Sequence, residues 1–227
     1  MKEKDFFFIP RSASDADTTI ADLCAKRLPG TYSYNPLRDI QVLCPSRKGS
    51  TGTVALNNTL QKYLNPPHRE KKEKKYGETL FRTGDKVMQI KNNYNIPYLN
   101  LKTNDEGMGI YNGDIGIIAD INTQKASMLI EFDDERLVEY EFAWLDELEL
   151  AYALTVHKSQ GCEFKAVILS VSPTAPMLCV RNLLYTAVTR AKEIVVLVGS
   201  DETVAKMVSN NRETKRYSGL PIKLRKD

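Results

Sequence analysis

Residues that could contact phosphate oxygens follow directly after a short apolar run. Residues 151–156 predict a buried strand, and this run breaks at once into the polar or small residues 157–161. Ligands of an open parallel sheet bind just beyond the carboxyl ends of its strands, so chemistry is expected at this break. The hydroxyl of Thr155 and the imidazole of His157 can bond to phosphate oxygens of a nucleic-acid backbone, a contact that positions a strand without reading its sequence.

Three further residues could contact a nucleotide. Gly161 lacks a Cβ, so its backbone can approach a ligand closely. Glu163 can accept hydrogen bonds from ribose hydroxyls, and Arg190 offers a planar, permanently charged fork that suits a γ-phosphate. Taken singly, Arg190 is better explained as a solvated helix residue and His157 as a loop histidine. The order and spacing of these residues together favour the functional interpretation.

Two segments resemble motifs V and VI of superfamily 1 helicases, in the form found in the RecD/TraA branch. The first is T-x-H-K-S-Q-G-x-E-F at residues 155–164, and the second is Y-T-A-V-T-R-A-K at residues 185–192. The residues that the resemblance assigns to ATP are Gln160, Gly161, Glu163, Arg190 and Arg47, with Arg190 and Arg47 as the catalytic arginines. The residues that it assigns to single-stranded DNA are Thr155, His157, Lys158 and Ser159.

Arg47 lies in a basic, glycine-rich turn between a predicted strand and a predicted helix. The strand is expected at residues 40–44, and the turn P-S-R-K-G-S-T-G follows at residues 45–52. This arrangement presents backbone amides and a cation to phosphate. The turn also resembles motif IV of the same helicases, where an arginine approaches the γ-phosphate. Lys48 competes with Arg47 for this role, and an ordinary loop is an equal alternative for the turn taken alone.

The segments around these motifs predict an α/β domain. The expected strands are residues 6–9, 40–44, 151–156, 166–171 and 193–199. The expected helices are residues 16–28, ended by Pro29 and Gly30, residues 181–191, which carry Arg190, and residues 200–209.

Residues 80–149 have a different character. Short β-like runs separated by turn signals replace the helical periodicity, which is typical of a small antiparallel barrel. The sequences G-D-K-V-M-Q at residues 84–89 and N-G-D-I-G at residues 112–116 resemble the same helicase family, which carries a Src-homology-3-like barrel there. The chain holds extra residues at 96–108 between these two signatures. They form either a local elaboration or a disordered loop.

The predicted fold class is therefore α/β, with a RecA-like parallel sheet of the P-loop NTPase type and an inserted Src-homology-3-like β-barrel. Residues 1–79 and 150–227 are expected to form the second motor domain of a helicase, and residues 80–149 the barrel. The sequence contains no G-x-x-x-x-G-K-[ST] pattern, and the acidic pair Asp134-Glu135 is expected to be a hairpin turn rather than a Walker B end. ATP and Mg²⁺ would thus be held mainly by a first motor domain that this chain lacks. No metal site is expected within the chain, and the isolated chain is predicted to be inactive.

Composition sets wider limits on function. The 227 residues are 42% hydrophobic and 27% charged, as in ordinary soluble proteins. No apolar run approaches the ~18 residues of a membrane span, and the amino terminus does not resemble a signal peptide, so a cytoplasmic protein without a membrane partner is expected. The cysteines form no C-x-x-C pair, which disfavours zinc.

Charge is unevenly distributed along the chain. The basic runs at residues 68–75 and 205–227 give weak support to a nucleic-acid partner, whereas the acidic stretch at residues 131–149 indicates a face that does not hold DNA. The basic end contains R-x-x-K-R-Y-S-G-L at residues 212–220, which is similar to the carboxyl terminus of the family.

The predicted function is that of the C-terminal motor domain of an ATP-dependent DNA helicase, which completes the ATP site with an arginine finger and grips single-stranded DNA. The resemblance implies 5′-to-3′ movement in recombination, repair or conjugative transfer. The partners it implies are single-stranded DNA, the first RecA-like domain and, as a further option, subunits of a helicase–nuclease complex. Two alternatives remain: a stand-alone nucleic-acid-binding or regulatory module without ATPase activity, and a protein-interaction domain whose barrel binds a partner.

Overall fold

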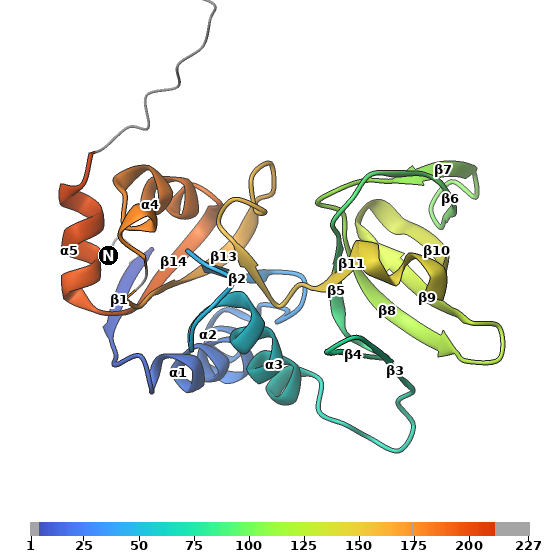
Figure 1. Cartoon of the computed structure of the whole chain (residues 1–227), viewed down its shortest axis with the longest axis horizontal. Helices are drawn as coiled ribbons and strands as arrows, with labels where there is room; N and C mark the ends of the chain where they lie inside the picture. The colour runs from blue at the N-terminus through green and yellow to red at the C-terminus, as the bar shows by residue number, and fades with distance from the viewer. Residues whose placement is uncertain (1–4, 174, 212–227) are drawn as a thin grey trace, which may run out of the picture.

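Two large sheets of different kinds and one two-stranded hairpin build the described part of the molecule (Figure 1). The computed structural model describes residues 5–173 and 175–211, so the basic pattern at residues 212–220 lies outside the described residues. The first sheet has five strands in the order β1-β14-β13-β2-β12, and every pairing in it is parallel. Its strands are β1 (Phe6–Pro10), β2 (Ile40–Cys44), β12 (Ala153–Thr155), β13 (Phe164–Val171) and β14 (Ala191–Gly199).

Helices cover both faces of the parallel sheet. On one face lie α1 (Ala16–Asp22), a π-helical turn η1 (Leu23–Arg27), α2 (Leu28–Tyr32) and α3 (Thr53–Leu64). On the other face lie α4 (Arg181–Val188) and α5 (Asp201–Ser209). Consecutive residues of one strand face opposite sides of the sheet and so belong to different hydrophobic cores. Val42 lies in the cluster that contains Ile20 of α1, and Leu43 lies in the cluster that contains Leu183 of α4. Strands buried on both faces read as continuous apolar runs, as the sequence does here.

The first helical segment is longer than its sequence predicts. It does not end at Pro29 and Gly30 but continues to Tyr32. The N–H of Leu28 donates to the carbonyl of Leu23, which is the wider hydrogen bond of a π turn. This turn precedes the proline and lets Pro29, which has no N–H to donate, stand at the start of the next helical turn. The chain then leaves the helix at Ser33, in a left-handed conformation.

The helix expected at residues 181–191 is shorter than predicted. It ends at Val188, because Ala191 already pairs with Phe164 as the first residue of β14. Arg190 therefore lies in the turn between α4 and β14 and not on the helix.

The second sheet is antiparallel and has seven strands in the order β11-β5-β8-β9-β10-β6-β7. Its strands are β5 (Lys86–Gln89), β6 (Asn93–Asn100), β7 (Glu106–Ile110), β8 (Ile115–Asn122), β9 (Ser127–Phe132), β10 (Arg136–Glu141) and β11 (Leu148–Leu150). A short hairpin of β3 (Glu73–Tyr76) and β4 (Thr79–Arg82) precedes it. The extra residues 96–108 are a local elaboration, since they form most of the hairpin β6–β7. Asp134 and Glu135 lie in a turn between β9 and β10, as expected.

A buried carboxylate connects the antiparallel sheet to the α/β part. Asp85 lies just before β5. It accepts hydrogen bonds from Gln61 Nε2 of α3 (2.6 Å) and from Asn65 Nδ2, just after the end of α3 (2.6 Å). It also accepts from the hydroxyl of Tyr152 (2.8 Å) and the N–H of Arg82 (2.7 Å). Burial raises the pKa of this carboxyl group, and each of these donors opposes that effect. The barrel thus joins the rest of the chain through a buried polar network. The domain boundaries at residues 80 and 149 stay a prediction.

Candidate nucleotide and nucleic-acid site

The turns after β2 and β12 lie side by side. These two strands are parallel neighbours, and Cys44 pairs with Thr155 at their carboxyl ends. Arg47 follows the first strand and Lys158 follows the second. Arg47 Nη1 donates to Glu149 Oε1 at 2.9 Å, and Lys158 Nζ donates to Glu149 Oε2 at 2.7 Å. One carboxylate therefore holds a cation from each turn.

Glu149 belongs to β11, and the sequence did not indicate it as a site residue. It was part of the acidic stretch at residues 131–149, whose face was expected not to hold DNA, and that expectation stays a prediction. Burial raises the pKa of its carboxyl group, but the hydrogen bonds and charges of Lys158 and Arg47 outweigh burial and leave the pKa lowered. The sequence signal that could have identified Glu149 is its position as an acidic residue just before the apolar run at residues 151–156.

The loop after β12 is held by its own hydrogen bonds. Thr155 Oγ1 accepts from the N–H of Lys158 at 3.3 Å, and the Thr155 carbonyl accepts from the N–H of Ser159 at 3.2 Å. Ser159 is fully buried, and its hydroxyl donates to the carbonyl of Val156 at 2.8 Å. The predicted direct contact of Ser159 with DNA does not suit this geometry, because the side chain points inward. His157 and Gln160 are exposed on the same loop.

Gly161 has a backbone conformation that residues with a side chain rarely adopt. Its φ is +92°, in the left-handed region, and a Cβ placed on it would meet no atom of the described residues within 4 Å, its two chain neighbours aside. The glycine is therefore required by backbone conformation rather than by crowding within the chain.

Arg190 is tied to the far end of this loop. Its Nη1 donates to the carbonyl of Cys162 at 3.2 Å, and its Nε donates to the carbonyl of Thr186 at 3.3 Å. The carbonyl of Arg190 accepts from the N–H of Phe164 at 2.9 Å. Glu163, also on this loop, forms an exposed ion pair with Lys192 at 3.2 Å.

The predicted site residues fall into two groups at opposite edges of the parallel sheet. Arg47, Thr155 and Lys158 follow the carboxyl ends of β2 and β12, as expected. Glu163 and Arg190 instead precede β13 and β14, so they lie at the amino-terminal edge. The loop at residues 156–163 crosses from one edge to the other and connects the groups. The sequence placed chemistry just after residues 151–156 and predicted strands at residues 166–171 and 193–199, but it assigned Glu163 and Arg190 to no edge of the sheet.

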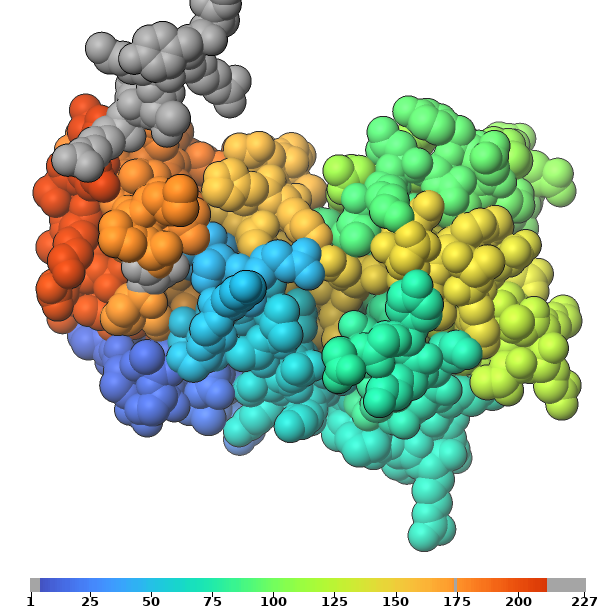
Figure 2. Space-filling view, in the orientation of Figure 1, coloured from blue at the N-terminus to red at the C-terminus, as the bar shows by residue number. Residues whose placement is uncertain are grey.

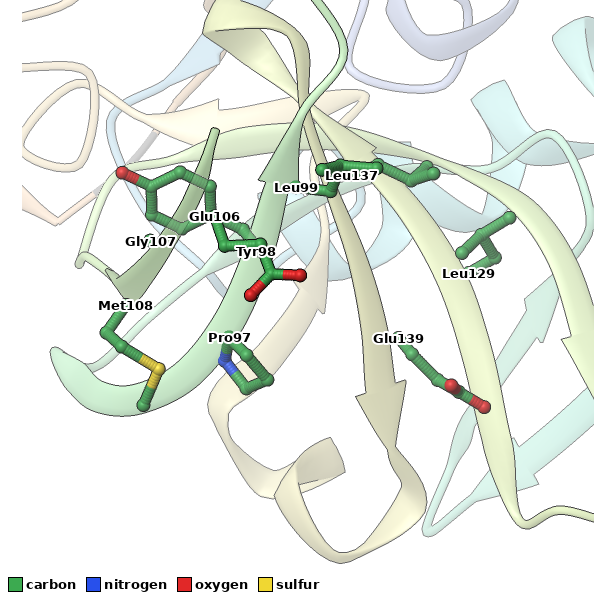
Figure 3. Close-up of a pocket in the computed structure, with 9 residues that line it drawn as sticks. All are labelled: Pro97, Tyr98, Leu99, Glu106, Gly107, Met108, Leu129, Leu137 and Glu139. Carbon is green, nitrogen blue, oxygen red and sulfur yellow. The ribbon is translucent and has the colours of Figure 1, made fainter. Parts of the chain in front are cut away.

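The barrel carries a separate groove, away from the motif residues (Figure 3). It has a volume of about 480 Å³ and lies between the hairpin β6–β7 and the outer face of β9 and β10. Leu129, Leu137 and Met108 supply apolar surface, and Glu106 and Glu139 supply carboxylates. None of the predicted site residues lines it.

Comparisons with known proteins agree with the motifs and with the two sheets. Residues 56–132 match the family described as the ATP-dependent RecD-like DNA helicase SH3 domain, and residues 150–198 match the UvrD-like helicase C-terminal domain. The ATP-dependent RecD2 DNA helicase of Deinococcus radiodurans is 35% identical over 181 residues, which is 80% of this chain and 23% of that protein. The chain belongs to the RecD/TraA-type superfamily 1 helicases.

Other relatives support the same family. RecBCD enzyme subunit RecD of Mycobacterium tuberculosis is 29% identical over 193 residues, covering 83% of this chain and 29% of that protein. Conjugal transfer protein TraA of Agrobacterium fabrum is 30% identical over 118 residues, covering 52% of this chain and 9% of that protein. The RecD/TraA-type chain thus spans under a third of the length of these curated relatives.

A solved structure shows the same fold. The Pif1 helicase from Bacteroides, in complex with ADP-AlF3 and ssDNA, has a TM-score of 0.50 and 19% identity, covering 93% of this chain and 49% of that one. The RecD/TraA-type chain therefore has a RecA-like parallel sheet with a Src-homology-3-like insertion, as predicted. No helix among residues 5–173 and 175–211 is long and apolar enough to cross a membrane.

Proposed function

We propose that this chain is the second motor domain of an ATP-dependent DNA helicase. The observation that supports this most is the convergence of its three motifs on one loop. Lys158 of this loop shares a carboxylate with Arg47, and Cys162 of the same loop accepts a hydrogen bond from Arg190. A motor must link nucleotide state to its grip on the nucleic-acid strand. A loop that is bonded to Arg190 directly, and to Arg47 through Glu149, offers such a link.

The nucleotide-facing role goes to Arg190, with Arg47 as the second cation. Two hydrogen bonds to backbone carbonyls hold the guanidinium of Arg190 through Nε and Nη1, which fixes its direction. An arginine held in this way can stabilise the charge that develops on a γ-phosphate in the transition state. Gln160 and Glu163 are proposed to contact the rest of the nucleotide. ATP and Mg²⁺ would be held mainly by a P-loop domain, and among the described residues no cluster of His, Cys, Asp or Glu could hold a metal ion.

The DNA-facing role goes to His157, Thr155 and Lys158. His157 is exposed, and the side chain of Lys158 is about 29% exposed. The Lys158 amine shares the Glu149 carboxylate with Arg47 of the loop after β2. Contacts of this kind with phosphate oxygens position a single strand without reading its sequence. Ser159 is proposed to shape the loop through its bond to Val156 rather than to contact DNA.

The test separates the two ligands in a protein that joins this chain to a P-loop motor domain. Arg190→Ala should slow ATP turnover by roughly 10³-fold while sparing DNA affinity, since its charge acts in the transition state. His157→Ala should weaken binding of single strands of any sequence and blunt the stimulation of ATPase by DNA. Fluorescence anisotropy and ATPase rates measure the two effects.

The opposite pattern would show that the two ligand assignments are reversed. DNA binding without any ATPase activity in such a two-domain protein would favour the stand-alone module. We also propose 5′-to-3′ movement in recombination, repair or conjugative transfer, as the resemblance of the motifs implies; conjugal transfer is named for one relative, TraA. Unwinding of duplexes with a 5′ tail but not a 3′ tail checks the direction.

A further inference from the structure

Glu149 is the one residue that joins the motif IV turn to the motif V loop by side-chain bonds in the described part of the chain. Each of its carboxylate oxygens accepts from a different cation, at 2.9 Å from Arg47 Nη1 and 2.7 Å from Lys158 Nζ. The side chain of Glu149 is about one-third exposed, so the pair is partly shielded from water and from salt. A partly buried carboxylate with two cations orients both of them.

Both cations keep donors for a ligand. Arg47 uses only Nη1 of its guanidinium for Glu149, and its side chain remains 55% exposed. Lys158 uses one of the protons of its ammonium group. The carboxylate therefore does not block these groups. It holds both of them on one side chain and leaves each with N–H groups that Glu149 does not use.

Glu149 also connects both turns to the barrel. It lies in β11, where it pairs with Met88 of β5, and β12 begins only a few residues later. The side chain of Asn57 of α3 stabilises the link between β11 and β12. It donates to the carbonyls of Leu150 and Ala153 and accepts from the N–H of Ala153. The carboxylate is thus mounted on rigid backbone, which a positioning role requires.

We propose that Glu149 is a positioning residue that holds Arg47 of the nucleotide-facing turn and Lys158 of the DNA-facing loop on one carboxylate, and so couples the turn to the loop. This inference rests on the proposed function for the identity of the ligands. Without the carboxylate, two like charges would repel and each side chain would regain its rotamer freedom.

The experiment uses Glu149→Gln, which keeps the shape of the side chain and removes its charge. The change makes the chain more positive, so nonspecific electrostatics alone would tighten the binding of a polyanion. A positioning role predicts the reverse: affinity for an oligodeoxythymidine single strand should fall roughly two- to fivefold. Asp146→Asn is the matched control, because Asp146 also pairs with a lysine, Lys91, on the barrel, and its loss should leave affinity unchanged or tighter.

A second measurement does not depend on DNA. Backbone amides of both turns donate within their own turn: Ser159 to Thr155 and Cys162 to Ser159 in one, Gly52 to Gly49 in the other. Hydrogen exchange at these amides should accelerate in both turns in Glu149→Gln and stay unchanged in Asp146→Asn. Glu149→Asp keeps the charge on a shorter side chain that cannot reach both cations, so it should loosen the turns too.

The outcomes separate the inference from the proposed function. If a protein that joins the wild-type chain to a P-loop motor domain binds no single strand, but Glu149→Gln still accelerates exchange in both turns, the proposed function fails and the positioning role stands. If exchange in either turn is unchanged, or if a binding-competent chain binds as tightly or more tightly without the carboxylate, the positioning role is overturned. A thermal unfolding curve of each variant verifies that it is folded.

Discussion

Lys86 is a buried cation at the start of the barrel that the proposed function does not use. It is 3% exposed, and its amine donates to Gln41 Oε1 at 2.9 Å and lies 5.7 Å from the centre of the Phe164 ring. Burial lowers the pKa of Lys86 from 10.5 to about 8, although Asp133 and other negative groups oppose this shift. The folded state therefore holds this proton less tightly than the unfolded state.

Stability should respond to pH in a defined window because of Lys86. Between about pH 8 and 10.5 the unfolded chain binds more protons at this residue, so the free energy of unfolding should rise with pH there. The full contribution is at most about 3 kcal/mol, at 1.36 kcal/mol per pKa unit. Below about pH 8 both states are protonated and Lys86 adds no slope.

The measurement is urea unfolding across this window in the wild type and in Lys86→Met. Burial raises the pKa of the Cys24 and Cys44 thiols, which gives a slope of the opposite sign in both proteins. The difference between the two curves reports Lys86 together with its charge effect on the Cys24 thiol, whose pKa Lys86 lowers. An identical pH dependence in the two proteins would contradict the prediction.

At the scale of elements, β5 and β11 are the first and last strands of the barrel along the chain, and they connect it to the α/β part. They pair with one another, Gln89 opposite Leu148, and the N–H of Ile90 donates to the carbonyl of Glu147 at 2.7 Å. The chain can therefore be closed at this point with a short turn. The buried network around Asp85 and the bridge of Glu149 both lie on the α/β side of it.

Deletion of residues 91–146, with a short Gly/Ser turn joining Ile90 to Glu147, should leave an α/β part that unfolds cooperatively. Deletion at the predicted limits of residues 80 and 149 serves as the comparison. That cut removes Asp85 and leaves Gln61, Asn65 and Tyr152 without their buried partner, which is costly. Thermal unfolding by circular dichroism distinguishes the two products. If both were equally stable, the Asp85 network would not join the parts as described.

At the scale of the whole molecule, the barrel and the α/β part lie next to one another along the long axis (Figure 2). Every motif residue belongs to the α/β part, which contributes arginines and a DNA-facing loop to the proposed site. The triphosphate cradle of a P-loop is absent from the sequence.

The isolated chain should accordingly show negligible ATPase activity, since arginines alone do not bind and orient the triphosphate and Mg²⁺. The measurement is phosphate release by the purified chain with and without single-stranded DNA. Arg190→Ala is the control, because activity from a contaminating enzyme would be unaffected by it. Release above background that disappears in this variant would refute the half-site interpretation.

The sequence by itself determined most of the fold and the types of the site residues. Apolar runs such as that of β2 were bounded correctly, since strands buried on both faces carry a continuous hydrophobic signal. The two motif segments also indicated the family, because they resemble motifs V and VI of superfamily 1 helicases in residue types, order and spacing.

Only the tertiary structure decided how those residues are arranged. It moved Arg190 from a helix to a turn, because pairing of Ala191 with Phe164 outweighed local helical preference. It turned Ser159 inward, and it brought Glu149 between Arg47 and Lys158. These are contacts between segments far apart in the chain or within one folded loop. Local periodicity carries no information on them, since strand pairing and burial set them only when the sheets form.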